Sequence, residues 1–141
     1  MAAEFFVDTS AWYPILVKAH PDHAGLAAAL RGLISRRRRL VTTNLVVAET
    51  HVLLLRRVGH RVALAFARTV GEAPNLVVRS SEELEETAVH DWLARYADQG
   101  FSLTDAVSFA LMVERGIEEA LSLDNHFLVA GFRNLGAPPG R

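Results

Sequence analysis

The 141-residue sequence contains no cysteine, and this absence excludes several kinds of structure and chemistry. Disulfide bridges, zinc sites built on thiolates and thiol nucleophiles are all impossible. Any metal ion must therefore be held by oxygen atoms or by imidazole nitrogens. A chain without disulfides also suits a reducing compartment, so we expect a cytoplasmic location.

The sequence also lacks a long hydrophobic run. The apolar stretch Phe5-Phe6-Val7 is preceded by Glu4 and ended by Asp8, unlike the basic start and long apolar middle of a signal peptide. No later stretch reaches the roughly 20 residues of a membrane span. We therefore expect no membrane association.

An excess of charge of one sign is missing as well, because 15 basic and 16 acidic residues leave a formal net charge of −1. The chain as a whole thus has no electrostatic attraction to nucleic acid. A run of arginines is the candidate for local contact with RNA, and the alternative is a solvated cationic helix end, which the helix dipole favours. The run is Arg36, Arg37, Arg38 and Arg39, and Arg31, Arg56, Arg57 and Arg61 could extend it.

What is present is the composition of a soluble globular chain, with 50% hydrophobic and 22% charged residues. The length suits one domain. We expect this domain to cover residues 1–135, followed by a short C-terminal tail at 136–141, where glycine and proline are frequent.

Short apolar segments typical of buried strands alternate with longer segments of helical periodicity. This alternation predicts an α/β fold, with a parallel sheet covered by helices on both faces and ligands at the carboxyl ends of the strands. The expected strands are 5–7, 40–42, 76–78 and 120–123, with an edge strand near Phe132. The expected helices cover about 12–16, 23–34, 44–58, 62–70, 84–96 and 102–116, with Ser80 and Glu83 as a capping box before 84–96, and a short turn or helix begins at Asp124.

Acidic residues follow the predicted strands. Asp8 and Asp124 come directly after the first and fourth strands, and Asp105 lies in the first turn of the helix between the third and the fourth. Glu49 lies about one turn into the helix after the second strand. Its neighbours three and four residues further on are apolar, so we expect its carboxylate to border a buried face, where an unpaired charge is costly.

Each of these residues also has a purely structural interpretation. Asp8 and Asp124 could be helix N-caps, Asp105 could form a capping box with Ser102, and Glu49 could pair with an arginine. Together, however, clustered carboxylates repel one another and raise one another's pKa unless a cation lies between them. Oxygen ligands favour Mg²⁺ or Mn²⁺ over zinc, and such an ion suits phosphodiester hydrolysis.

Four segments, in this order, resemble those of the PIN-domain ribonucleases, and most closely the VapC-type toxins of toxin–antitoxin pairs. They are Phe5 to Ala11, Thr42 to Glu49, Phe101 to Ser108, and Leu121 to Phe127. The resemblance runs nearly end to end. It implies a three-layer α/β/α PIN-like domain with a central parallel sheet of four to five strands.

The resemblance also implies site residues. Asp8, Glu49, Asp105 and Asp124 would form an acidic quartet that binds Mg²⁺ or Mn²⁺ and positions the attacking water. Similar proteins have polar residues beside that site that could support the carboxylates, and here these positions hold Thr9, Ser10 and Ser122. Asn44 matches the pattern too, although it could instead be the N-cap of the helix that carries Glu49. His126 receives no role, because the family pattern assigns no chemistry to its position.

The function that the resemblance implies is that of a Mg²⁺- or Mn²⁺-dependent endoribonuclease, the toxin of a VapBC-type pair. Such proteins cut single-stranded or loop RNA, form homodimers and are silenced by an antitoxin. An excess of apolar residues in 12–33 and 45–66 is consistent with a dimer or antitoxin interface. The alternatives are a PIN nuclease of RNA maturation or decay, and a non-catalytic RNA- or protein-binding module.

Overall fold

A five-stranded parallel sheet lies at the centre of the computed structural model, which describes residues 3–136. The strand order is β3-β2-β1-β4-β5, and every neighbouring pair is parallel. All strands therefore end at one edge, called here the carboxyl edge, and begin at the opposite one, the amino edge. The strands are β1 (Glu4–Val7), β2 (Arg39–Thr43), β3 (Leu76–Val78), β4 (Glu119–Leu121) and β5 (Arg133–Asn134).

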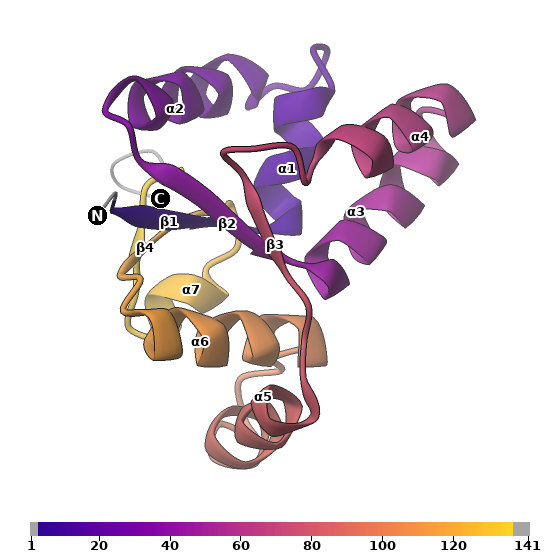
Figure 1. Ribbon diagram of the computed structural model, residues 1–141. Coiled ribbons are helices and arrows are strands. Elements are labelled where there is room, and N and C mark those ends of the chain that lie inside the picture. The colour runs from indigo at the N-terminus through magenta and orange to yellow at the C-terminus, as the bar shows by residue number, and fades with distance from the viewer. Residues whose placement is uncertain (1–2, 137–141) are drawn as a thin grey trace.

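Helices cover both faces of the sheet, which gives three layers (Figure 1). The helices α1 to α4 lie over one face, and α3 and α4 pack together as an arm that extends from the body. The second face is covered by α6 and α7, with α5 packed against α6. The bounds are α1 (Thr9–Leu16), α2 (His23–Ser35), α3 (Asn44–Arg57), α4 (His60–Thr69), α5 (Glu82–Thr87), the π-helix η1 (Ala88–Leu93), α6 (Leu103–Arg115) and α7 (His126–Val129).

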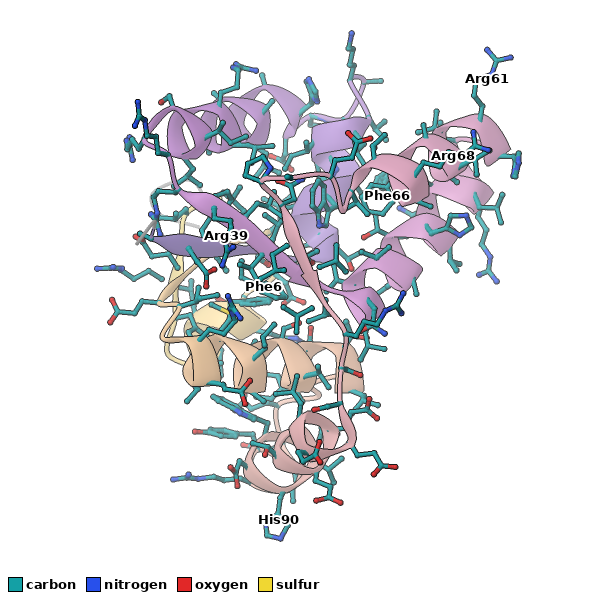
Figure 2. All side chains as sticks on the ribbon, viewed as in Figure 1. Phe6, Arg39, Arg61, Phe66, Arg68 and His90 are labelled. Carbon is teal, nitrogen blue, oxygen red and sulfur yellow. The ribbon has the colours of Figure 1, made fainter. Side chains whose placement is uncertain are left out.

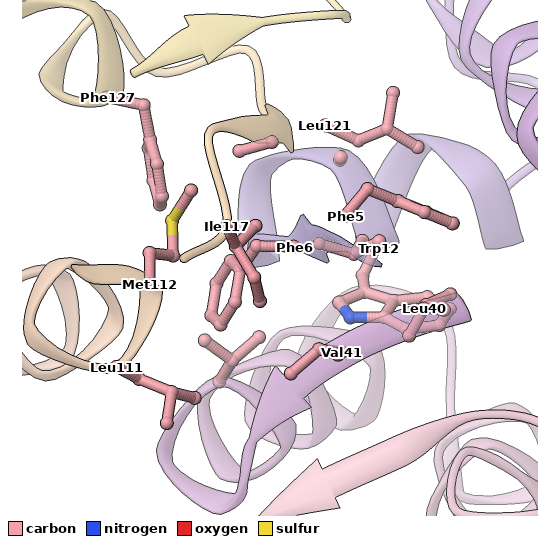
Figure 3. Packing of buried hydrophobic residues seen from close by; sticks show 14 of the residues in the cluster. Phe5, Phe6, Trp12, Leu40, Val41, Leu111, Met112, Ile117, Leu121 and Phe127 are labelled. Carbon is pink, nitrogen blue, oxygen red and sulfur yellow. The ribbon is translucent and has the colours of Figure 1, made fainter. Parts of the chain in front are cut away.

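The central strand β1 carries side chains into both layers of the core. Phe5 and Phe6 are fully buried and, as neighbours in a strand, point to opposite faces. Phe6 packs against the ring of Phe127 from α7, with the ring centroids 6.0 Å apart. Figure 3 shows Phe5 near Trp12 of α1, and Phe6 near Met112 of α6. Residues buried on both sides explain why this strand is apolar throughout its last three positions.

The order of the strands creates a switch point beside β1. The chain passes from β1 to β2 and β3 on one side of the sheet, and then returns to β4 and β5 on the other. In parallel sheets the crevice at such a switch point, at the carboxyl edge, is where ligands bind. The fold thus places the expected binding crevice between the ends of β1 and β4.

The predicted α/β class, the parallel sheet and its five strands are confirmed. The expected 84–96 helix is instead divided into α5 and η1. Its N-cap is Ser81, whose hydroxyl accepts from the N–H of Leu84, so the prediction of a capping box at Ser80 is wrong. Ser80 uses its hydroxyl to donate to Glu85 instead.

The predicted C-terminal tail lies mostly outside the described residues, which end at Gly136. Gly136 itself donates its N–H to Asn134 Oδ1 at 3.0 Å. A β-carbon at this position would lie 2.7 Å from Leu26 Cδ2, so Gly136 packs closely against the body. Within residues 3–136, every helix is too short or too polar to cross a lipid bilayer.

Candidate active site

Asp8 lies at the switch point, directly after β1. Its residue is 4% exposed, and its carboxylate accepts from the N–H of Ser10 at 3.4 Å as the N-cap of α1. Burial raises the pKa of Asp8 to about 6, the hydrogen bond from the Ser10 hydroxyl opposes this rise, and the nearby charge of Asp105 adds to it. Asp8 is thus both an N-cap and a buried acid in the field of a second carboxylate.

Two hydroxyls hold the Asp8 carboxylate in place. Ser10 Oγ donates to Asp8 Oδ2 at 2.8 Å, and Ser122 Oγ lies 3.2 Å from the same oxygen. Each hydroxyl in turn accepts a backbone N–H from the loop after β4, Ser10 from Leu123 and Ser122 from Asp124, both at 2.9 Å. These N–H groups leave the hydroxyl protons free to point toward Asp8.

Asp105 lies at the start of α6. Its Oδ2 accepts from the N–H of Ser102 at 3.1 Å, and its own N–H donates to Ser102 Oγ at 3.0 Å. This is the capping box considered from the sequence. The same oxygen, Oδ2, also lies 3.0 Å from Nδ1 of His126, so the capping role and a place in the site are combined in one side chain.

Asp124 brings the loop after β4 into the same group. Its Oδ1 accepts from the N–H of His126 at 2.9 Å, and its Oδ2 lies 3.4 Å from His126 Nδ1. One potential ligand atom from each of Asp105, Asp124 and His126 lies within 4.8 Å of the others. His126 therefore belongs to the group although the sequence analysis left it out. The Asp-X-His spacing after a strand is the signal that could have identified it.

We call Asp8, Asp105 and Asp124 the carboxylate cluster. Among residues 3–136, no lysine or arginine forms an ion pair with any of its members, and His126 is their only basic contact. Three carboxylates without a permanently charged partner suit a divalent cation, and their oxygen atoms are ligands that Mg²⁺ and Mn²⁺ accept. The donor set thus fits the metal site predicted from the sequence.

Glu49, the fourth predicted acid, lies on the second turn of α3. The residue is exposed, and among the described residues its carboxylate makes no hydrogen bond or ion pair. The expectation that it borders a buried face is wrong, because the buried residues of α3 are Val46, Thr50 and Leu54. The apolar run after Glu49 allowed several choices of buried stripe, and contact with α1 and α4 selected this one.

Two other predicted polar residues have separate surroundings. Asn44 is not the N-cap of α3, since Thr43 accepts the N–H of Val46 in that role. Instead, Asn44 Oδ1 accepts from the N–H of Ser80 at 2.8 Å and ties α3 to the segment after β3. Thr9 is buried beside Asp8, and its Oγ1 has no hydrogen-bond partner among residues 3–136.

The arginine run lies at the amino edge, across the sheet from the carboxylate cluster. It leads into β2, where Arg39 stands opposite Glu4 of β1. Arg38 donates to Glu119 at 2.6 Å, and Arg39 donates to Glu4. Figure 2 shows Arg61 on the α3–α4 arm, far from Arg39, so Arg61 does not extend the arginine run. The strands between the two edges separate this run from the site.

Comparison with known proteins identifies relatives over nearly the whole chain. Residues 5–133 match the PIN domain family model. The chain is 38% identical over 127 residues to the 23S rRNA-specific endonuclease VapC20 of two Mycobacterium tuberculosis strains, covering 90% of this chain and 94% of the relative.

Structural comparison leads to the same relative. The crystal structure of Mycobacterium tuberculosis VapC20, described as a toxin that cleaves the sarcin–ricin loop, has a TM-score of 0.81 and 36% sequence identity, and the match covers 91% of this chain and 95% of that one. The resemblance stated from the sequence is thereby confirmed. With a family model spanning almost all of its length and a relative of the same size and fold, this chain belongs to the PIN domain family.

Proposed function

We propose that this protein is a divalent-metal-dependent endoribonuclease of the VapC type, acting at the carboxylate cluster. The observation that carries the proposal is the convergence of Asp8, Asp105 and Asp124 at the switch point of the sheet without a lysine or arginine partner among the described residues. The similarity to an rRNA-specific endonuclease over 90% of the chain supports the same reaction.

In this proposal Asp8, Asp105 and Asp124 would hold Mg²⁺ or Mn²⁺. The bound ion would polarise a phosphodiester oxygen and lower the pKa of a water molecule. Ser10 and Ser122 keep Asp8 oriented through their hydroxyls. In the reaction a water oxygen forms a bond to phosphorus, and the bond from phosphorus to a ribose oxygen breaks.

Glu49 remains the fourth acidic member of the proposed site. It lies on the second turn of α3, a helix that starts at the carboxyl edge where β2 ends. An exposed carboxylate there is available to accept a hydrogen bond from water or from a nucleotide hydroxyl. We therefore place its contribution at the substrate rather than in the buried part of the site.

Loop RNA is the substrate class that we propose. The curated relative acts on 23S rRNA, and its crystal structure is described as that of a sarcin–ricin loop cleaving toxin. A hairpin loop offers unstacked bases and an accessible backbone, which sequence-specific RNA-binding proteins use. A ribosomal RNA loop is thus the first substrate to test.

The biological role that we propose is that of a toxin silenced by an antitoxin, in a homodimer. Exposed apolar side chains on α3 and at its C-cap support an interface there, and they are Val52, Leu55 and Val58. Sizing with light scattering of the purified protein, alone and with the product of a neighbouring small reading frame, tests both statements. A monomer at micromolar concentration would contradict the dimer.

The decisive experiment uses purified protein, an rRNA loop oligonucleotide and a mixed RNA pool, each with Mg²⁺ or Mn²⁺. We expect cleavage by the wild-type protein, and a loss of about 100-fold or more in the Asp8→Asn protein and in excess chelator. Cleavage that persists in excess chelator would contradict the metal-dependent reaction. A folded wild-type protein that binds RNA and cuts none would favour the non-catalytic binding module instead.

A further inference from the structure

The imidazole of His126 lies within the proposed metal site, and the reaction proposed above assigns it no task. Its Nδ1 is 3.0 Å from Asp105 Oδ2 and 3.4 Å from Asp124 Oδ2. The two oxygen atoms come from different elements, one from α6 and the other from the loop after β4. One nitrogen and two carboxylate oxygens thus converge from separate parts of the chain.

The His126 ring is held in this orientation by its surroundings. It packs edge-on against Phe101, with ring centroids 5.2 Å apart and planes at 78°. Phe101 is buried and packs in turn on Phe109, a fully buried residue of α6, at 5.0 Å. The backbone N–H of His126 donates to Asp124 Oδ1, which leaves Asp124 Oδ2 on the side of the His126 ring nitrogen. Little side-chain entropy therefore remains to be lost when a ligand binds.

We propose that His126 supplies a nitrogen ligand to the divalent cation of this site, and that this ligand gives the site a preference for Mn²⁺ over Mg²⁺. The proposal rests on the proposed function, because it takes the carboxylate cluster to be the metal site. Mg²⁺ is bound through oxygen ligands and keeps much of its water. Imidazole nitrogen is a ligand of transition metals, and among these Mn²⁺ is the one that also suits the carboxylate oxygens of this site.

The competing role for His126 is that of a protonated counter-ion to Asp105 and Asp124, with no bond to metal. Both roles place Nδ1 between the two carboxylates. They differ in what happens when Mn²⁺ binds, because a ligand nitrogen lies in direct contact with the ion and a counter-ion is displaced from it. A measurement that detects a nitrogen nucleus next to bound Mn²⁺ therefore separates the two.

The experiment is pulsed electron paramagnetic resonance of Mn²⁺ bound to the full-length protein, together with Mn²⁺ and Mg²⁺ affinities from titration calorimetry. Three variants are compared with the wild type. His126→Asn removes the ring, and His126→Asp replaces its nitrogen by an oxygen ligand. His90→Asn is the matched control, because His90 is exposed on η1 and points away from the body (Figure 2).

We expect a ¹⁴N coupling on bound Mn²⁺ in the wild type and in His90→Asn, and none in either His126 variant. His126→Asn should weaken Mn²⁺ binding by about 10-fold. His126→Asp should keep cation binding but lower the ratio of Mn²⁺ to Mg²⁺ affinity several-fold. Circular dichroism checks that the variants are folded.

Two results would count against the proposal in different ways. Tight Mn²⁺ binding without ¹⁴N coupling in the wild type would overturn the ligand role of His126 and leave the proposed nuclease intact. Absence of binding of either metal by the folded wild-type protein would overturn the metal site itself, and the inference with it.

Discussion

Each of the two edges of the sheet carries an acidic side chain at one end of β1, but the pKa of the acid is lowered at the amino edge and raised at the carboxyl edge. At the amino edge, Glu4 accepts from Arg39 and from Arg115, the latter at 2.9 Å. The hydrogen bond with Arg115 lowers the pKa of Glu4, against a desolvation effect that raises it, and Arg39 lowers it further. At the carboxyl edge, four residues later, the pKa of Asp8 is raised to about 6. One acid gains a cation on folding, and the other does not.

This difference teaches how to distinguish structural from functional charge in this protein. A carboxylate paired with arginine has its charge compensated within the chain, so it can fasten β1 to β2 and α6 without help. A buried carboxylate with no such partner destabilises the fold unless something outside the chain compensates it. The amino edge is therefore stabilising, while the carboxyl edge is prepared for a ligand.

The largest effect on stability should come from Asp8→Asn in metal-free protein. Because the folded-state pKa of Asp8 is about 6 and that of an unfolded aspartate is about 3.9, stability is lost as pH rises from about 4 to 6. The variant should equal the wild type near pH 4 and exceed its unfolding free energy by up to about 3 kcal/mol at pH 7.5. Chemical denaturation at the two pH values measures this.

Metal provides the control for that prediction. Mn²⁺ or Mg²⁺ should raise the melting temperature of the wild type at pH 7.5, because an ion that binds only the folded protein stabilises it. The same ions should have little effect on Asp8→Asn, because this variant lacks the Asp8 carboxylate. A variant that is less stable than the wild type at both pH values would contradict the assignment of Asp8 as an uncompensated charge.

A smaller effect of opposite sign is expected at the amino edge. Glu4→Gln should lower the unfolding free energy at pH 7 by about 1 kcal/mol, since the ion pairs with Arg39 and Arg115 are partly exposed and screened. The folded-state pKa of Glu4 is lowered, so this stability is present above the unfolded pKa and is lost as pH falls through the folded one.

Cleavage serves as the second readout for Glu4→Gln. RNA cleavage at pH 7 should stay within about twofold of the wild type, because Glu4 lies across the sheet from the carboxylate cluster. A strong loss of cleavage in a folded Glu4→Gln protein would show that the two edges are not independent.

The smallest effects should distinguish arginines at the two edges. Arg79 is exposed and follows β3 at the carboxyl edge, whereas Arg36 is exposed at the end of α2 near the amino edge. Arg79→Ala should weaken RNA binding several-fold and reduce its salt dependence, as the loss of one phosphate contact does. Arg36→Ala should leave binding within about twofold. Fluorescence anisotropy measures both RNA affinities, with each substitution made in a catalytically inactive variant. Equal losses of affinity for the two substitutions would show that the arginine run contacts RNA.

Much of the fold and part of the site followed from sequence patterns. The strands were recognisable because short apolar runs ended at polar residues, and a parallel sheet must then bring Asp8 and Asp124 to one edge. Glu49 was misjudged because the run Val52 to Leu55 is apolar on every side of the helix, so periodicity could not select the buried stripe. The arginine run precedes the second strand, so the parallel sheet already places it at the amino edge, but its pairing with Glu4 depended on the register of β2 with β1.

The sequence by itself determined the α/β alternation and the position of each acidic residue relative to a strand end, because both depend on local periodicity and chain order. Only the tertiary structure decided which charges meet. Arg38 reaches Glu119 across 81 residues, and His126 reaches Asp105 across 21. Such pairs form when packing brings distant segments together, and short-range sequence patterns contain no information about them. The compensation of charge at one edge and its absence at the other is therefore a property of the folded chain.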